Sequence, residues 1–203
     1  MTTAIGIVHD EKVDAAWVMC LLKLRLHPDI TDCIMVQGGP GNFDVARNKV
    51  AAHFLTSSAA DYLLTVDTDM VFTPEDYEAL RDWEVGVVSA VYFIADDPPR
   101  PCFGRRNGDG RIKTVQDWKG QGRIEVDALG GGFCLIRRDV LTDIGPVANA
   151  DRGGPWYRQD LLGFAGQGLE PDHAFCQRAQ EAGHHVYVDT NVVVGHIKPR
   201  VLQ

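Results

Sequence analysis

The sequence lacks the features that mark several classes of protein. Its five cysteines are odd in number, widely spaced and without a Cys-x-x-Cys pair, which argues against a disulfide framework and against a zinc site. No apolar run reaches the roughly 18 residues of a membrane span, since the longest, at 85–95, is too short. Residues 1–10 lack the basic and apolar segments of an export signal. These absences predict a cytoplasmic protein with reduced thiols and no membrane span.

Basic residues are also few. The chain has 20 Lys and Arg against 28 Asp and Glu, a formal net charge of −8. This charge disfavours broad electrostatic binding to nucleic acid, because that affinity comes from neutralising phosphates. A length of 203 residues with 45% hydrophobic and 24% charged residues fits one globular domain with a sizeable core. No internal repeat is present, so we expect residues 1–203 to form a single domain.

A short apolar stretch that ends in two carboxylates is the most informative part of the chain. Residues 62–66 read Tyr-Leu-Leu-Thr-Val and predict a strand buried on both faces, which places Asp67 and Asp69 at its carboxyl end. Carboxylates there suit a hard divalent cation such as Mg²⁺ or Mn²⁺, which itself binds phosphate oxygens. The bare Asp-x-Asp pattern carries little weight in a chain rich in Asp, and a plain polar turn is the alternative. The context favours the metal site, because Thr73 and Pro74 then begin a predicted helix.

The preceding elements predict a sheet whose ligand contacts share that edge. Residues 4–8 predict the first strand and place His9 at its carboxyl end, where it either contacts a ligand or is a simple loop residue. Residues 32–37 predict a second strand, and the next helix opens at Asp44 as its N-cap. Arg47 then lies in the first turn. Its guanidinium could reach a nucleotide base or phosphate, or else be a solvated or salt-bridged side chain.

Residues 96–123 differ in composition from the rest of the chain. They hold three prolines, five glycines and seven basic residues against four acidic ones, a net charge of +3 within an acidic protein. A long insertion of this kind is usually a functional lid or a flexible segment, and a surface loop without a role is the alternative.

Two glycine-rich segments follow. Residues 130–132 are three consecutive glycines before a predicted strand, which indicates close approach of a ligand or of backbone. We therefore expect Gly131 and Gly132 to line the pocket. Residues 151–169 predict a second loop, in which Trp156 either stacks on a sugar or covers the core.

Several short motifs follow one another along the chain, and their order is more specific than any single motif. They are Ala-Arg-Asn at 46–48, Asp-Thr-Asp at 67–69, Gly-Gly-Gly-Phe at 130–133, Leu-Ile-Arg-Arg at 135–138, Asp-His-Ala-Phe-Cys at 172–176 and Gly-His at 195–196. This set resembles glycosyltransferases of the GT-A fold, most closely the family 2-like group, over roughly residues 4–198. The family pattern has Glu-Asp ahead of the Phe-Cys helix, whereas Pro171 takes the Glu place here and Glu170 is displaced by one. Asp172 still matches.

The resemblance implies a fold and an activity. The fold would be a single Rossmann-like α/β domain with a mostly parallel mixed central sheet flanked by helices. The activity would be metal-dependent transfer of a sugar from a nucleotide-sugar, most commonly a UDP-sugar, to an acceptor hydroxyl. The acceptor would be a glycan, a protein or a modified DNA base. If residues 96–123 cover the acceptor site, their positive charge implies an anionic acceptor, and a hydroxylated DNA base or an acidic glycan both qualify.

The resemblance also implies roles for individual residues. Asp67, Asp69 and His196 would hold Mn²⁺ or Mg²⁺, and Thr68 would lie against the nucleotide. If the reaction inverts configuration, Asp172 would be the catalytic base, because a carboxylate must take the proton of the acceptor hydroxyl. The alternative is that Asp172 only stabilises the first turn of its helix.

Two rival functions fit much of the same pattern. A sugar-phosphate nucleotidyltransferase could use a similar fold and metal, but such enzymes generally carry a Gly-rich, basic loop after the first strand, where this chain has His9-Asp10-Glu11. A non-catalytic nucleotide-sugar-binding module is the other rival. The intact carboxylates and His196 count against it.

Overall fold

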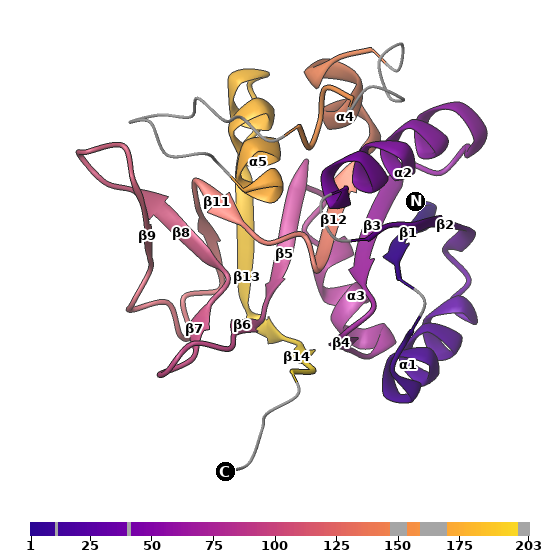
Figure 1. Ribbon diagram of the computed structural model, residues 1–203, viewed down its shortest axis with the longest axis horizontal. Coiled ribbons are helices and arrows are strands. Elements are labelled where there is room, and N and C mark those ends of the chain that lie inside the picture. Colours follow the sequence, from indigo (N-terminus) through magenta and orange to yellow (C-terminus); the bar gives the residue numbers. More distant parts are fainter. Residues whose placement is uncertain (11, 40–41, 147–153, 159–169, 199–203) are drawn as a thin grey trace.

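The computed structural model is organised around a seven-stranded sheet (Figure 1). It describes residues 1–203 except 11, 40–41, 147–153, 159–169 and 199–203. Across the sheet the strands lie in the order β10 (Arg123–Glu125), β13 (Val186–Val193), β5 (Val87–Val91), β12 (Phe133–Arg137), β3 (Tyr62–Asp67), β1 (Thr3–His9) and β2 (Ile30–Gln37). Five strands run in one direction, and β10 and β12 run against them. The predicted mixed, mostly parallel α/β sheet is thus confirmed.

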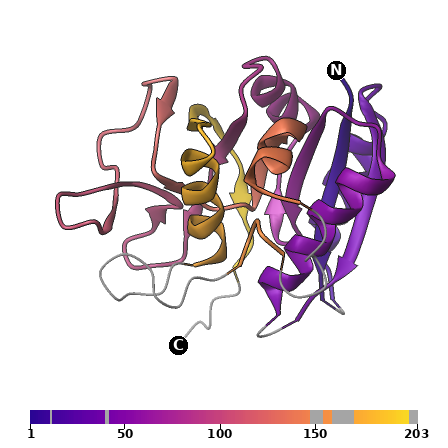
Figure 2. The same cartoon turned by 90° about the horizontal axis from the view of Figure 1, so that it is seen from above.

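Helices cover both faces of this sheet. They are α1 (Ala15–Arg25), α2 (Phe43–Ser57), α3 (Pro74–Arg81), α4 (Arg138–Ile144) and α5 (Pro171–Glu181). Helices α1 and α3 pack on one face, and α2, α4 and α5 pack on the other (Figure 2). Strand β1 shows why two cores form, because Ile5 and Ile7 point into the first core while Ala4 and Val8 point into the second. No helix in the described part of the chain has the length and apolar character to cross a membrane.

The start of α2 differs from the sequence prediction. The N-cap is Asn42, not Asp44, and Asp44 lies in the first turn. The Asn42 side chain does not cap the helix, because its oxygen accepts a hydrogen bond from the Gly39 N–H at 2.8 Å. Arg47 therefore lies two residues deeper in the helix than expected, in the second turn and on the face that packs against the sheet.

Residues 96–123 form strands where the sequence predicted a structureless excursion. Strand β7 (Arg100–Pro101) pairs with β6 (Phe93–Ile94), and β8 (Phe103–Arg106) pairs with β9 (Ile112–Thr114) and with β11 (Ala128–Leu129). Two aromatic side chains anchor this part of the chain, since Phe103 and Trp118 are buried in the core and contact each other edge to face. Burial of these aromatic side chains stabilises the short strands, which the Pro and Gly content of the segment did not predict.

The carboxyl-terminal part of the sheet also differs in detail. Strand β13 runs without a break over Val186–Val193, and its pairing with β5 is irregular between Asp189 and Val193. Strand β14 (Gly195–His196) then pairs with β4 (Met70–Val71), which follows directly after the Asp-x-Asp segment. This pairing brings the end of the chain back to the carboxyl end of β3. Most of the predicted 151–169 loop lies outside the described residues.

The helix start at Thr73 is confirmed as a capping box, and it gives a stability prediction. The Thr73 hydroxyl accepts from the Asp76 N–H, and the Asp76 carboxylate accepts from the Thr73 N–H. Thr73→Ala should therefore lower the free energy of unfolding by about 1 kcal/mol in urea denaturation. Thr142→Ala is the control, because this exposed hydroxyl donates only to the Arg138 carbonyl one turn back in α4. Equal effects of the two substitutions would show that the box contributes nothing specific.

Candidate functional site

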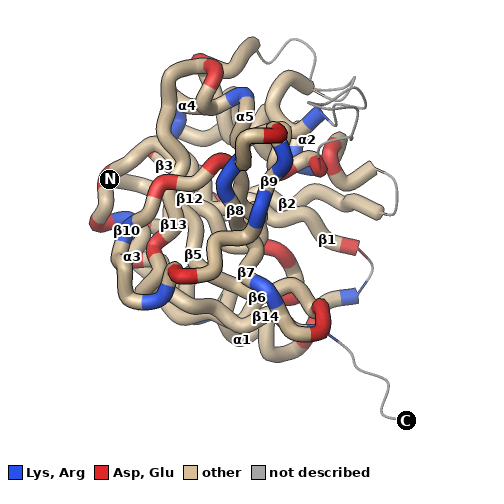
Figure 3. The backbone as a smooth tube through the Cα atoms, turned by 90° about the vertical axis from the view of Figure 1, so that its left-hand side faces the viewer, with Lys and Arg blue, Asp and Glu red and all other residues tan. Residues whose placement is uncertain are grey.

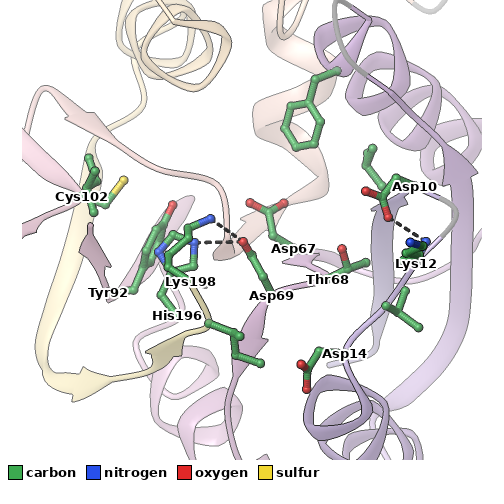
Figure 4. A pocket seen from close by; sticks show the side chains of 15 residues that line it. Asp10, Lys12, Asp14, Asp67, Thr68, Asp69, Tyr92, Cys102, His196 and Lys198 are labelled. Atoms are coloured by element: carbon green, nitrogen blue, oxygen red, sulfur yellow. Dashed lines mark hydrogen bonds and ion pairs between the residues drawn. The ribbon is translucent and has the colours of Figure 1, made fainter. Parts of the chain in front are cut away.

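A cavity of about 770 Å³ lies at the carboxyl ends of β1 and β3 (Figure 4). Its walls come from the segment after β1, from the Asp-x-Asp segment, from the start of α2 and from the end of the chain. Its lining includes Asp10, Phe43, Asp67, Asp69, His196 and Lys198. In open α/β sheets ligands bind at this edge, where strand ends expose backbone and side-chain polar groups.

One oxygen of Asp69 has two basic partners. Its Oδ2 lies 3.1 Å from His196 Nε2 and accepts a hydrogen bond from Lys198 Nζ at 2.6 Å. Although partial burial acts in the opposite direction, these hydrogen bonds lower the pKa of Asp69 to about 2. Asp69 is therefore a carboxylate over the whole neutral range, and 35% of its side chain remains exposed in the cavity.

The orientation of His196 follows from its second nitrogen. Nδ1 lies 2.7 Å from the carbonyl oxygen of Phe93, and because a carbonyl only accepts, Nδ1 carries a hydrogen. Nε2 therefore either donates to Asp69 as part of an imidazolium or presents a lone pair in the neutral ring. Although partial burial opposes it, the bond to Asp69 raises the pKa of His196. Because a backbone carbonyl fixes the ring through Nδ1, Nε2 is the nitrogen of His196 that could bind a metal ion.

Asp67 has a different hydrogen-bond partner from Asp69. Both of its oxygens accept hydrogen bonds from Arg47 Nη2, at 2.9 and 3.2 Å. Burial raises the pKa of Asp67, and the Arg47 guanidinium offsets part of that rise. The structure thus separates the two carboxylates by partner: Asp69 meets His196 and Lys198, whereas Asp67 meets Arg47.

Arg47 is the most buried charge of the site. Its side chain is 3% exposed, and its guanidinium lies between Asp67 and Asp172, with Nε 3.4 Å from Asp172 Oδ1. Although desolvation opposes its charge, the carboxylates of Asp172 and Asp67 raise the pKa of Arg47. The ring of Phe43 covers the guanidinium at 4.7 Å. The Arg47 side chain is therefore salt-bridged and not solvated, and it does not line the larger cavity.

The structural reason for glycine at positions 130–132 differs from the one expected. A Cβ at Gly131 would overlap with the Arg47 guanidinium, and a Cβ at Gly130 would overlap with the Tyr92 hydroxyl. The Gly131 carbonyl accepts from Arg47 Nη1 at 3.2 Å, and its N–H donates to Asp172 Oδ2 at 2.9 Å. Gly131 and Gly132 are buried beneath the site and do not line the larger cavity. The close approach that the glycines permit is that of protein side chains.

A second cavity of about 390 Å³ adjoins the first, and Ile94 and Cys102 line both. Asp172 lines the second cavity, together with Glu170 and His173 from the same helix start and Arg100 from β7. Asp172 Oδ1 has no hydrogen-bond partner among the described residues apart from its contact with Arg47 Nε. The structure therefore brings Asp69 and His196 to one cavity and Asp172 to its neighbour.

Comparisons with known proteins bear on the fold. No protein-family model and no curated protein matches the sequence. Among solved structures, A197 from STIV matches with a TM-score of 0.60 at 17% identity, over 100% of this chain and 97% of that one. GalNAc-T7 with UDP, GalNAc and Mn²⁺ matches with a TM-score of 0.61 at 12% identity, over 98% of this chain and 43% of that one. The chain has a glycosyltransferase-like, GT-A-type fold.

Not every predicted site residue lies at the cavities of this GT-A-type domain. His9 is partly buried, and its Nδ1 contacts the Asp10 carbonyl oxygen at 2.8 Å, while the cavity is lined by Asp10 instead. Trp156 is 0% exposed, and its indole N–H donates to the Leu141 carbonyl. It covers the core and has no free face for a sugar. Thr68 does line the larger cavity.

The residues of the larger cavity that the sequence interpretation missed include Phe43, Tyr92 and Lys198. Lys198 carried a usable signal, because it follows the predicted ligand His196 by two residues and so shares its side of an extended chain. Tyr92 carried no such signal in the sequence. Its hydroxyl accepts a hydrogen bond from the Gly132 N–H at 3.2 Å, and this contact joins residues that are 40 positions apart in the chain.

The buried position of Arg47 gives a second prediction. Arg47→Met should lower the free energy of unfolding by about 2–4 kcal/mol, because it leaves Asp67 and Asp172 without their counter-charge. Arg100→Met is the matched control, since the Arg100 to Asp96 ion pair is exposed and should contribute no more than about 1 kcal/mol. Chemical denaturation of both variants at neutral pH measures the difference. Equal losses would contradict the central role given to Arg47.

Proposed function

We propose that this chain is a metal-dependent glycosyltransferase that moves a sugar from a UDP-sugar to an acceptor hydroxyl. The observation that carries the proposal is the pairing of Asp69 with His196 at the open edge of a GT-A-type sheet, inside a cavity large enough for a nucleotide-sugar. The likeness in fold to a protein whose structure contains UDP and Mn²⁺ supports it.

The residues present fit a divalent cation. A carboxylate oxygen and an imidazole nitrogen 3.1 Å apart are a chemically suitable donor pair for Mn²⁺ or Mg²⁺. No group of three or more His, Cys, Asp and Glu side chains converges among the described residues, so the protein would supply two ligands and the nucleotide phosphates and water the others. Asp67 is not counted among these ligands, because both of its oxygens accept hydrogen bonds from Arg47. When bound, the cation would neutralise negative charge on the departing diphosphate.

The larger cavity has one end suited to each part of the nucleotide. Asp10 and Phe43 lie at the end formed by β1 and α2, where a carboxylate and an aromatic ring suit the hydroxyls of a ribose and the face of a base. His196 and Lys198 lie at the other end with Asp69, where positive charge suits phosphates. A nucleotide in this orientation directs its sugar toward the cavity that Asp172 lines.

Asp172 is our candidate for the catalytic base of an inverting reaction. The hydrogen bond from the Gly131 N–H and the contact with Arg47 hold its carboxylate in one orientation. An acceptor in the smaller cavity would place its hydroxyl beside this carboxylate, which takes the proton as the new glycosidic bond forms. The leaving group is on the other side, in the larger cavity.

An anionic acceptor agrees with the charges around the smaller cavity. Arg100 lines it, and the β8–β9 hairpin beside it carries Arg105, Arg106, Arg111 and Lys113 (Figure 3). Arg105 and Lys113 are exposed cross-strand neighbours. These charges would attract a phosphate-bearing or acidic acceptor, and an acidic glycan and a modified DNA base are both of this kind.

Removal of the Asp69 charge tests the metal site. Asp69→Asn should abolish Mn²⁺-dependent binding of UDP in isothermal titration calorimetry while the fold is retained, because an amide lacks the charge of the ligand oxygen. Asp14→Asn is the control: Asp14 lines the same cavity and caps α1, and Asn caps a helix equally well. Unchanged Mn²⁺ dependence in Asp69→Asn would refute the metal site.

Substitution of Asp172 tests the chemical step. Asp172→Asn keeps the shape of the side chain but accepts no proton, so kcat should fall by about 10²–10⁴-fold with UDP affinity in Mn²⁺ nearly unchanged. Glu170→Gln, in the lining of the same cavity, should change kcat by no more than a few-fold. A normal kcat in Asp172→Asn with a slightly lower melting temperature would mean that Asp172 only serves its helix.

A further inference from the structure

Lys198 occupies the position of a cation on Asp69. Its Nζ donates to Asp69 Oδ2 at 2.6 Å, the same oxygen that faces His196 Nε2 (Figure 4). The backbone beside it is held in place, because the Ile197 N–H donates to the Asp69 carbonyl at 2.8 Å. The side chain itself is 41% exposed in the cavity. A fixed backbone with a flexible four-carbon stem lets the ammonium move while its origin stays beside the site.

The ammonium and a divalent cation would compete for this oxygen. Both carry positive charge and would lie at hydrogen-bond or coordination distance from Asp69 Oδ2, where they repel each other strongly. With the cation bound to Asp69 and His196, the ammonium of Lys198 must therefore leave Oδ2 for another anionic partner.

The other charges of the cavity identify that partner. Its described lining includes the carboxylates of Asp10, Asp14, Asp67 and Asp69, and the ammonium groups of Lys12 and Lys198. Because carboxylates outnumber ammonium groups, a nucleotide diphosphate entering this cavity needs every positive charge near its phosphates. Lys198 starts beside Asp69, where the phosphates must lie if they share the cation.

We propose that Lys198 is a built-in counter-cation that neutralises Asp69 before the metal ion binds and then binds the diphosphate of the donor. This inference rests on the proposed function, since it requires a metal ion on Asp69 and a nucleotide in the larger cavity. It assigns to one side chain two opposite effects: Lys198 weakens the binding of metal alone and strengthens the binding of nucleotide. A lysine that only forms a structural salt bridge with Asp69 would weaken the binding of metal but would not strengthen the binding of nucleotide.

The test measures the two affinities separately. Mn²⁺ is titrated into wild type, Lys198→Met, Lys198→Arg and Lys12→Met without nucleotide, with free Mn²⁺ followed by electron paramagnetic resonance. UDP is then titrated calorimetrically at saturating Mn²⁺. Lys198→Met should bind Mn²⁺ at least about threefold more tightly and UDP about tenfold more weakly than wild type, because it loses a competing charge and a charged hydrogen bond.

Two control variants show whether the effects belong to the charge of Lys198. Lys198→Arg should stay near wild type in both titrations, and Lys12→Met should keep the wild-type Mn²⁺ affinity, since the basic partners of Asp69 in the described part of the chain are His196 and Lys198. Unchanged or weaker Mn²⁺ binding by Lys198→Met, or unchanged UDP affinity, overturns the role of Lys198 and leaves the proposed function standing. Failure of the wild type itself to bind Mn²⁺, with or without UDP, overturns the proposed function and this inference together.

Discussion

The ion pairs of the buried Arg47 guanidinium are the interaction on which the rest of the site depends. One side chain from α2 connects the end of β3 through Asp67, the loop before β12 through the Gly131 carbonyl, and the start of α5 through Asp172. A guanidinium is suited to this position because its planar fork donates in several fixed directions and it stays charged when buried. Removal of any one partner would leave a desolvated charge, so the position of each element constrains the others.

This arrangement divides the acidic groups of the site by role. Asp67 and Asp172 are both held by Arg47, and each borders a different cavity. Asp69 lies outside this cluster, where its partners His196 and Lys198 come from the end of the chain through the pairing of β14 with β4. Arg47 with Asp67 and Asp172 is the buried cluster, and Asp69 with His196 and Lys198 is the more exposed one. This division fits a site that keeps its shape while cations and phosphates exchange in it.

Much of the fold was predictable from local sequence, whereas the connections within the site were not. The strand at 62–66 and the capping box at Thr73 depend on neighbouring residues, and both are confirmed. The role of Arg47 depends on Gly131 and Asp172, which lie 84 and 125 positions away in the chain, and no local pattern encodes such contacts. The ordered strands within 96–123 were missed for the same reason, since Phe103 and Trp118 stabilise them through burial that Pro and Gly content obscures. The sequence left open whether Trp156 stacks on a sugar or covers the core, because an aromatic residue in a glycine-rich segment has the same sequence pattern in both cases.

The most direct test of this account is a crystal structure of the protein grown with MnCl₂ and UDP, with the metal located by its anomalous scattering. The account predicts one strong anomalous peak within coordination distance of Asp69 Oδ2 and His196 Nε2, with Asp67 still bound to Arg47 and the Lys198 ammonium on a phosphate of UDP. A peak away from Asp69 and His196, or UDP bound with no metal at these residues, would contradict it.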